Sequence, residues 1–158
     1  MTNPNQPCVL MFKGRGLIST CIQWQTRGPY SHVGVLRPDG RVIEAWQGKG
    51  VRVTDLEDWR QVDRYHVVGI TETQWSEALE FMHAQVGKGY DYWAICRFIS
   101  RRLMPENDRW FCSELVFSAL SYAGVRLLHR VSPSEVSPSM MSLSPLLTPD
   151  PVPSANPV

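Results

Sequence analysis

The chain has three residues whose side chains together could support nucleophilic catalysis, and each lies in a predicted helix or strand. Cys112 lies at the predicted start of a helix, where unpaired backbone N–H groups and the helix dipole stabilise a thiolate, the reactive form of cysteine. His32 and Glu44 lie in one predicted hairpin. A cysteine beside a histidine whose other nitrogen is held by an acid provides a nucleophile, a base and an orienting group. These residue types predict cleavage of an acyl bond through a covalent intermediate.

The stretch from Ser31 to Trp46 predicts the hairpin that carries His32 and Glu44. Pro38-Asp39-Gly40 suits a three-residue loop whose glycine takes a left-handed conformation. In the resulting register His32 and Glu44 are diagonal neighbours on one face, and the apolar residues share the other face. Gly34 stands between them, and a glycine within a strand often marks close approach by another group. The alternative is that His32 and Glu44 are a solvent-exposed pair on the polar face of the hairpin. The apolar set comprises Val33, Val35, Ile43 and Ala45.

The other cysteines fit buried structural positions, with Cys8 in a predicted strand and Cys21 and Cys96 on apolar helix faces. A small buried thiol is also the alternative for Cys112. The chain has no Cys-x-x-Cys pair, so neither a zinc ribbon nor a disulfide framework is expected. A metal site made by the three candidate residues would lack an obvious fourth ligand, and we expect no metal or cofactor. His66, His83 and His129 are interpreted as structural histidines.

Hydrophobic periodicity predicts the elements that must position these residues. Strands are expected at 9–12, 51–53 and 65–70, with one helical turn over 55–59. Helices are expected over 17–25, over 71–86 with a capping box from Thr71 to Gln74, over 92–103 and over 112–123. Because the strands form hairpins rather than alternating with helices, the sequence predicts an α+β domain with an antiparallel sheet.

Length and composition predict one domain over residues 1–147 and a Pro-rich, flexible tail over 148–158. With 16 basic and 15 acidic residues, no global field favours nucleic acid. The basic group Arg97, Arg101 and Arg102 is interpreted as a solvated helix face. The first residues lack the features of a secretory signal, and no apolar run could span a bilayer. A cytoplasmic location is therefore the default expectation, with export by another route or a phage-associated location left open.

Four motifs occur here in one order: Tyr30-Ser-His-Val-Gly-Val35, Val42-Ile-Glu-Ala45 followed by Gly50-Val51, Gly87-Lys-Gly-Tyr-Asp91, and Phe111-Cys-Ser-Glu-Leu-Val116. This series resembles the circularly permuted branch of the NlpC-type papain-like hydrolases, the YiiX-like cysteine amidases and peptidases. The resemblance runs from about Val9 to near Pro145. It implies a papain-like α+β fold, in which an antiparallel sheet packs on helices and the catalytic cysteine opens a helix.

By motif match, the resemblance implies that Cys112 is the nucleophile, His32 the general base and Glu44 the third polar residue. Tyr30 and Tyr90 are implied as residues of the substrate site. Members of this group cleave amide bonds, often in cell-wall peptides, while the related lecithin:retinol acyltransferase-like proteins act on lipid esters.

We therefore expect a cysteine hydrolase acting on a peptide or other amide, with peptidoglycan-derived peptides among the candidates. One alternative is a lipid-directed thiol acyltransferase or esterase that uses the same triad, and another is a non-catalytic binding module that keeps the fold. Trp46 and Trp110 lie close in sequence to the candidate triad and could wall a cleft.

Overall fold

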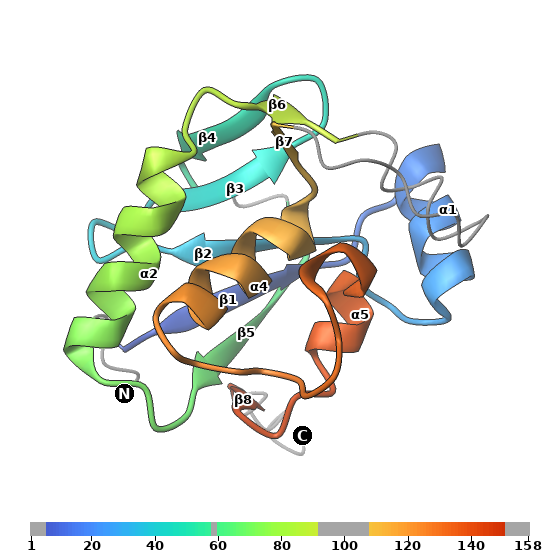
Figure 1. Cartoon of the computed structure of the whole chain (residues 1–158). Coiled ribbons are helices and arrows are strands. Elements are labelled where there is room, and N and C mark those ends of the chain that lie inside the picture. Colours follow the sequence, from blue (N-terminus) through green and yellow to red (C-terminus); the bar gives the residue numbers. More distant parts are fainter. Residues whose placement is uncertain (1–5, 58–59, 92–107, 151–158) are drawn as a thin grey trace, which may run out of the picture.

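The computed structural model describes residues 6–57, 60–91 and 108–150 (Figure 1). Its strands are β1 (Cys8–Phe12), β2 (His32–Leu36), β3 (Val42–Trp46), β4 (Gly50–Thr54), β5 (Val62–Val67), β6 (Gly89–Tyr90), β7 (Arg109–Trp110) and β8 (Leu147–Pro149). Its helices are α1 (Leu17–Thr26), α2 (Glu72–Ala84), α4 (Cys112–Tyr122) and α5 (Pro138–Met141), with a 3-10 helix η1 (Pro133–Glu135).

Most of these elements match the predicted ones to within a few residues, and the capping box of α2 is formed by Thr71 and Gln74 as predicted. Residues 55–57 are not helical, so the predicted turn is wrong there. The predicted helix over 92–103, with Cys96 and the basic group, lies outside the described residues.

β1 to β5 and β8 form a six-stranded antiparallel sheet in the order β4-β3-β2-β1-β5-β8, while β6 and β7 form a short parallel pair. α2 and α4 lie on the same side of the large sheet (Figure 1). Their buried faces form the main core with strand residues such as Val33, Val35 and Ile43, and a smaller apolar cluster lies on the other face around Leu10. The α+β class and the antiparallel sheet are confirmed. No helix within the described ranges is long and apolar enough to cross a bilayer.

The β2–β3 hairpin has the predicted register. Val35 pairs with Ile43, and the Arg37 N–H donates to the Arg41 carbonyl at 2.8 Å just before the loop. Gly40 has φ +81°, the left-handed conformation that the three-residue loop requires. The register follows from turn chemistry and from the apolar face, which is why both could be predicted.

The sheet continues into the segment that was expected to be a tail. Thr148 pairs with His66 and Pro149 with Tyr65 at the outer edge of β5, and the Asp150 N–H donates to the Arg64 carbonyl at 2.8 Å. Proline is tolerated there because an edge strand needs no N–H on its outer side. The paired edge strand thus runs past residue 147, where the sequence predicted the boundary of the domain. Residues 151–158 lie outside the described part of the chain.

A close backbone approach at Gly50 gives a stability prediction. A Cβ atom built on Gly50, which has φ +71°, would stand 2.1 Å from the Lys88 carbonyl oxygen, the acceptor for the Val51 N–H. Gly40 has a similar φ, but a Cβ there meets nothing within 4 Å. We expect Gly40→Ala to cost about 1 kcal/mol of unfolding free energy from the left-handed backbone alone. Gly50→Ala should cost about 1–3 kcal/mol more, because the backbone must also shift. Urea unfolding of both variants measures the difference, and equal costs would contradict the clash.

Candidate active site

His32, the first residue of β2, and Glu44, in the middle of β3, meet as the hairpin register predicts. His32 Nε2 and Glu44 Oε2 are 2.6 Å apart. Glu44 is fully buried and His32 is 8% exposed. Gly34 makes the meeting possible, since a Cβ there would lie 2.8 Å from Val42 Cγ1 and 3.3 Å from Glu44 Cβ. The pair is therefore a buried contact and not a solvent-exposed pair on the surface of the hairpin.

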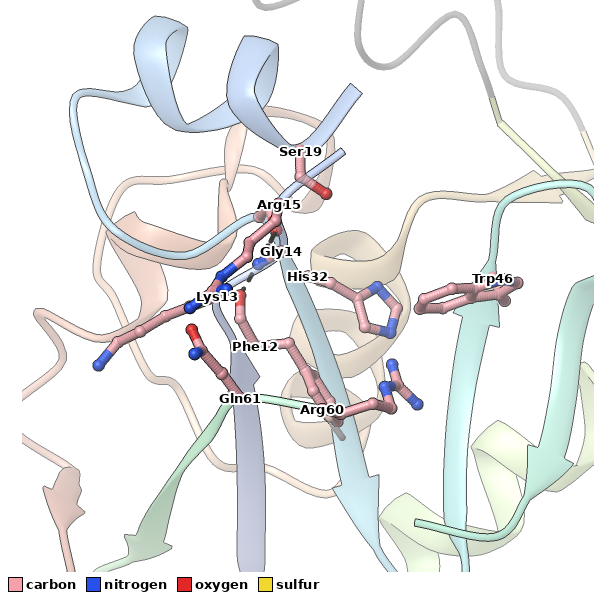
Figure 2. A pocket seen from close by; sticks show the side chains of 10 residues that line it. Phe12, Lys13, Gly14, Arg15, Ser19, His32, Trp46, Arg60 and Gln61 are labelled. Atoms are coloured by element: carbon pink, nitrogen blue, oxygen red, sulfur yellow. Dashed lines mark hydrogen bonds between the residues drawn. The ribbon is translucent and has the colours of Figure 1, made fainter. Parts of the chain in front are cut away.

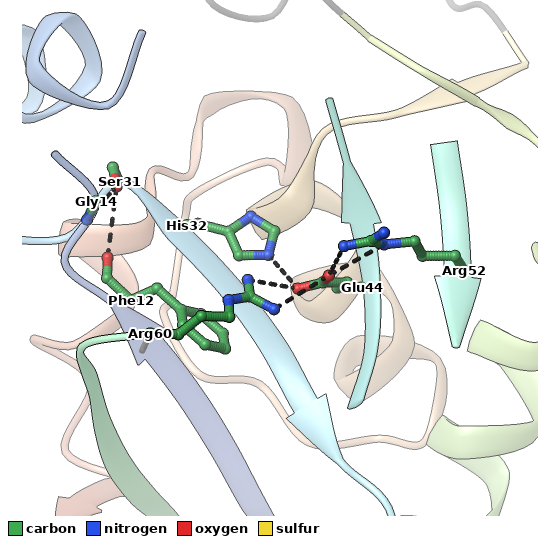
Figure 3. Close-up of polar contacts among 7 residues, drawn as sticks. All are labelled: Phe12, Gly14, Ser31, His32, Glu44, Arg52 and Arg60. Atoms are coloured by element: carbon green, nitrogen blue, oxygen red, sulfur yellow. Dashed lines mark hydrogen bonds and ion pairs between the residues drawn. The ribbon is translucent and has the colours of Figure 1, made fainter. Parts of the chain in front are cut away.

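Two arginines hold the other side of the Glu44 carboxylate (Figure 3). Arg52 Nη2 lies 2.9 Å from Oε1, and Arg60 Nη2 lies 2.9 Å from Oε2. The Arg60 guanidinium also lies over two aromatic rings, 3.9 Å from the centroid of Phe12 and 4.6 Å from that of Trp46. These contacts compensate the desolvation of a buried charge and fix the position of the carboxylate.

The charges around Glu44 set the protonation of the pair. Burial alone would raise the pKa of Glu44, but the hydrogen bonds and charges of His32 and Arg60 outweigh it and lower the pKa to about 2. Burial lowers the pKa of His32 despite the Glu44 carboxylate, and Arg60 acts in the same direction as burial. At neutral pH the pair is therefore a carboxylate and a neutral imidazole. Since Nε2–H donates to Glu44, the second ring nitrogen, Nδ1, is the acceptor.

These shifts predict loss of stability in acid. Because the pKa of folded Glu44 is about 2 against an ordinary 4.5, its contribution is complete above pH 4.5 and is lost as the pH falls towards 2. The lowered pKa of His32 acts in the same direction below its ordinary 6.5. We expect Glu44 to account for about 3 kcal/mol of unfolding free energy lost in acid. Urea unfolding at pH 7, 5 and 3 measures the loss, and a flat profile would contradict the assignment.

Cys112 is the first residue of α4, as predicted, and follows the N-cap Phe111. Its side chain is fully buried against β2, where the backbone N–H of Val33 faces the sulfur. Burial raises the pKa of the thiol to about 12, against the opposing effect of the Val33 and Ser113 backbone groups. The sulfur thus adjoins the residue that follows His32, but the thiol and the imidazole are not hydrogen-bonded to each other. Catalytic hydrogen bonds are often long before substrate binds.

A pocket of about 230 Å³ adjoins the exposed edge of His32 (Figure 2). Phe12 and Trp46 are its aromatic walls, and the Trp46 ring meets the His32 ring edge-on at 4.9 Å between centroids. Three cationic side chains also line it, and none of the described lining residues is acidic. The lining residues besides His32 and the two aromatic walls are Lys13, Gly14, Arg15, Ser19, Ser31, Arg60 and Gln61. Cys112 is not among these lining residues.

Of the other residues expected near the site, Trp46 lines the pocket, and the two tyrosines do not. Tyr30 is buried, and its hydroxyl donates to Asp63 Oδ2 at 2.6 Å. Tyr90 packs on Phe111 with ring centroids 5.8 Å apart. The binding role expected for both tyrosines stays a prediction. Of the two tryptophans, Trp46 forms a wall, whereas Trp110 donates from Nε1 to Gln85 at 3.2 Å.

Arg52 and Arg60 are the site residues that sequence reasoning missed. Arg52 pairs directly with Glu44 across the β3–β4 hairpin, so extending the hairpin argument past Gly48 could have found it. Arg60 lies in the loop before β5, and no strand register in the sequence indicated that it would contact Glu44.

The candidate residues do not suit a metal ion. Two guanidinium groups occupy both oxygens of Glu44 and would repel a cation. Within the described ranges, no group of three or more His, Cys, Asp or Glu side chains could hold a metal ion.

Comparison with known proteins agrees with this architecture. Among solved structures, the metalloprotein yiiX from Escherichia coli O157:H7 is similar in fold, with a TM-score of 0.72, 22% sequence identity and coverage of 95% of this chain and 98% of that chain. No curated protein sequence matches the chain at a significant level. Residues 10–136 match the model of a permuted papain-like amidase family, YaeF/YiiX, C92. The chain therefore belongs to the permuted papain-like amidase family, a family of cysteine peptidases and amidases.

Proposed function

We propose that this protein hydrolyses an amide bond through an acyl-enzyme, with Cys112 as nucleophile, His32 as general base and Glu44 as the group that orients the base. The observation that carries the proposal is the buried 2.6 Å contact between His32 and Glu44. It leaves an acceptor nitrogen on a neutral imidazole, next to the strand residue against which Cys112 packs. Membership of an amidase family supports the same reaction class.

In the proposed reaction His32 Nδ1 takes the thiol proton as the Cys112 sulfur attacks the substrate carbonyl carbon. The N–H groups at the start of α4 stabilise the oxyanion that forms. Glu44 stabilises the imidazolium, which then gives its proton to the departing amine nitrogen as the carbon–nitrogen bond breaks. Water, deprotonated by His32, attacks the thioester and releases the acid and the free thiol. Since thiol and imidazole both rest neutral, proton transfer accompanies attack rather than preceding it.

The full burial of Cys112 favours a second function, a binding module that keeps the fold without catalysis. Because the sulfur is fully buried, a substrate carbonyl reaches it only if the side chains that cover it move apart. Cys21, on α1, is partly exposed and offers an internal comparison for such access.

Modification of the folded protein with a neutral chloroacetamide probe, followed by peptide mapping, separates the two functions. The hydrolase proposal expects Cys112 to react about tenfold faster than Cys21 or more, because a histidine base activates it. Modification of Cys21 with none at Cys112 would favour the binding module. Turnover of amide, ester and phospholipid substrates by the same preparation then separates amide hydrolysis from a lipid-directed reaction.

A further inference from the structure

We propose that the pocket beside His32 recognises a carboxylate on the substrate, with Arg15 as the residue that determines this specificity. The inference rests on the proposed function, because it names a class of substrate for the same site. That class is amides whose flanking group carries one negative charge on a short aliphatic stem.

The charge of the pocket favours an anionic ligand. Lys13, Arg15 and Arg60 line the pocket without an acidic side chain among the lining residues. Two of these cations have carboxylate partners, Asp63 for Lys13 at 2.7 Å and Glu44 for Arg60 at 2.9 Å. Arg52 shares Glu44, so among the described residues in and around the pocket four cations face two carboxylates. Positive charge is thus in excess beside the proposed base.

Of the three cationic side chains that line the pocket, Arg15 is the one available to bind a substrate carboxylate. Arg60 is held by Glu44 and by two aromatic rings, and Lys13 is held by Asp63, which also accepts from the Tyr30 hydroxyl. Arg15 is exposed and forms no ion pair with any residue in the described ranges. A guanidinium binds a carboxylate with two parallel hydrogen bonds. One available guanidinium fits a single carboxylate better than a group of higher charge.

The shape of the site favours a carboxylate on a short aliphatic stem. Figure 2 shows Arg15 on one side of His32 and Trp46 on the other, with Phe12 and Arg60 below. The rings of Phe12 and Trp46 give apolar walls for the methylene groups of a short stem. A carboxylate at Arg15 and an amide carbonyl near His32 would then belong to neighbouring groups of one small substrate.

The test uses two probes that differ only in charge, chloroacetyl-glutamyl amide and chloroacetyl-glutaminyl amide. Their rates of alkylation at Cys112 are measured by peptide mapping. We expect the glutamyl probe to react about tenfold faster with Cys112 and no faster with Cys21. High salt should reduce the preference, because Arg15 is exposed to solvent and its charge is screened there.

Variants localise the effect. Arg15→Gln should abolish the preference for the glutamyl probe, and Arg15→Glu should reverse it. Arg126→Gln removes the same charge from an exposed position beyond the far end of α4 and is the matched control, expected to keep the preference.

The outcomes distinguish failure of the carboxylate inference from failure of the hydrolase proposal. Equal rates of both probes at Cys112 would overturn the carboxylate inference and leave the hydrolase intact. Equal effects of Arg15→Gln and Arg126→Gln would overturn it as well, since the preference would then report overall charge. If neither probe modifies Cys112 while Cys21 reacts, the hydrolase proposal fails and the inference fails with it.

Discussion

Cys112→Ala is expected to lower kcat by roughly 10⁶-fold, the size of loss that follows removal of a nucleophile acting together with a histidine. The side chain is fully buried, and alanine fills most of its volume, so the fold should survive the change. Steady-state turnover of an amide substrate measures the loss, and the urea midpoint of the same variant confirms that it is folded.

Two comparisons make this result specific. Cys21→Ala removes a partly exposed thiol on α1 and should leave kcat unchanged within about twofold. The double variant Cys112→Ala/His32→Ala should be no slower than Cys112→Ala alone, because a nucleophile and its base act as a unit. Retention of turnover by Cys112→Ala would overturn its assignment as nucleophile, and additive losses would separate His32 from the same step.

Glu44→Gln is expected to have the second-largest effect, on both turnover and stability. Glutamine keeps the shape of the side chain but cannot balance Arg52 and Arg60, whose guanidinium groups lie 2.9 Å from the present oxygens. An uncompensated buried charge costs about 3–5 kcal/mol. Loss of the group that fixes the tautomer of the base costs about 10⁴-fold in kcat in a related arrangement. Urea unfolding and turnover on one preparation measure the two effects.

Asp39→Asn is the matched control for Glu44→Gln. Asp39 also joins two arginines of the same hairpin, Arg37 at 3.0 Å and Arg41 at 2.9 Å, but its side chain is 37% exposed. An exposed ion pair contributes about 0–1 kcal/mol, and asparagine keeps an oxygen for the Arg41 N–H. A stability loss in Asp39→Asn as large as that in Glu44→Gln would show that burial is not the reason Glu44 matters.

Local rules in the sequence predicted the parts of the fold that local contacts build. Turn residues and an alternating apolar face placed His32 and Glu44 on one side of a hairpin, and helix periodicity placed Cys112 at a helix start. Arg60 could not be predicted, because a loop residue reaches Glu44 through tertiary packing against Phe12 and Trp46. The same holds for the burial of Cys112 and for β8, an edge strand formed by a Pro-rich segment whose composition is typical of a tail.

The hairpin also has a consequence for the order in which the protein folds. The contacts of Glu44 with Arg52, His32 and Arg60 span only 8, 12 and 16 positions, so their loops close at low entropic cost. The contact of Cys112 with Val33 closes a far longer loop and requires α4 to dock on the sheet. His32 and Glu44 can therefore assemble early, whereas the Cys112 thiol joins them only when α4 has docked on the sheet. A folding intermediate that forms before that step would contain the His32–Glu44 pair without Cys112 beside it.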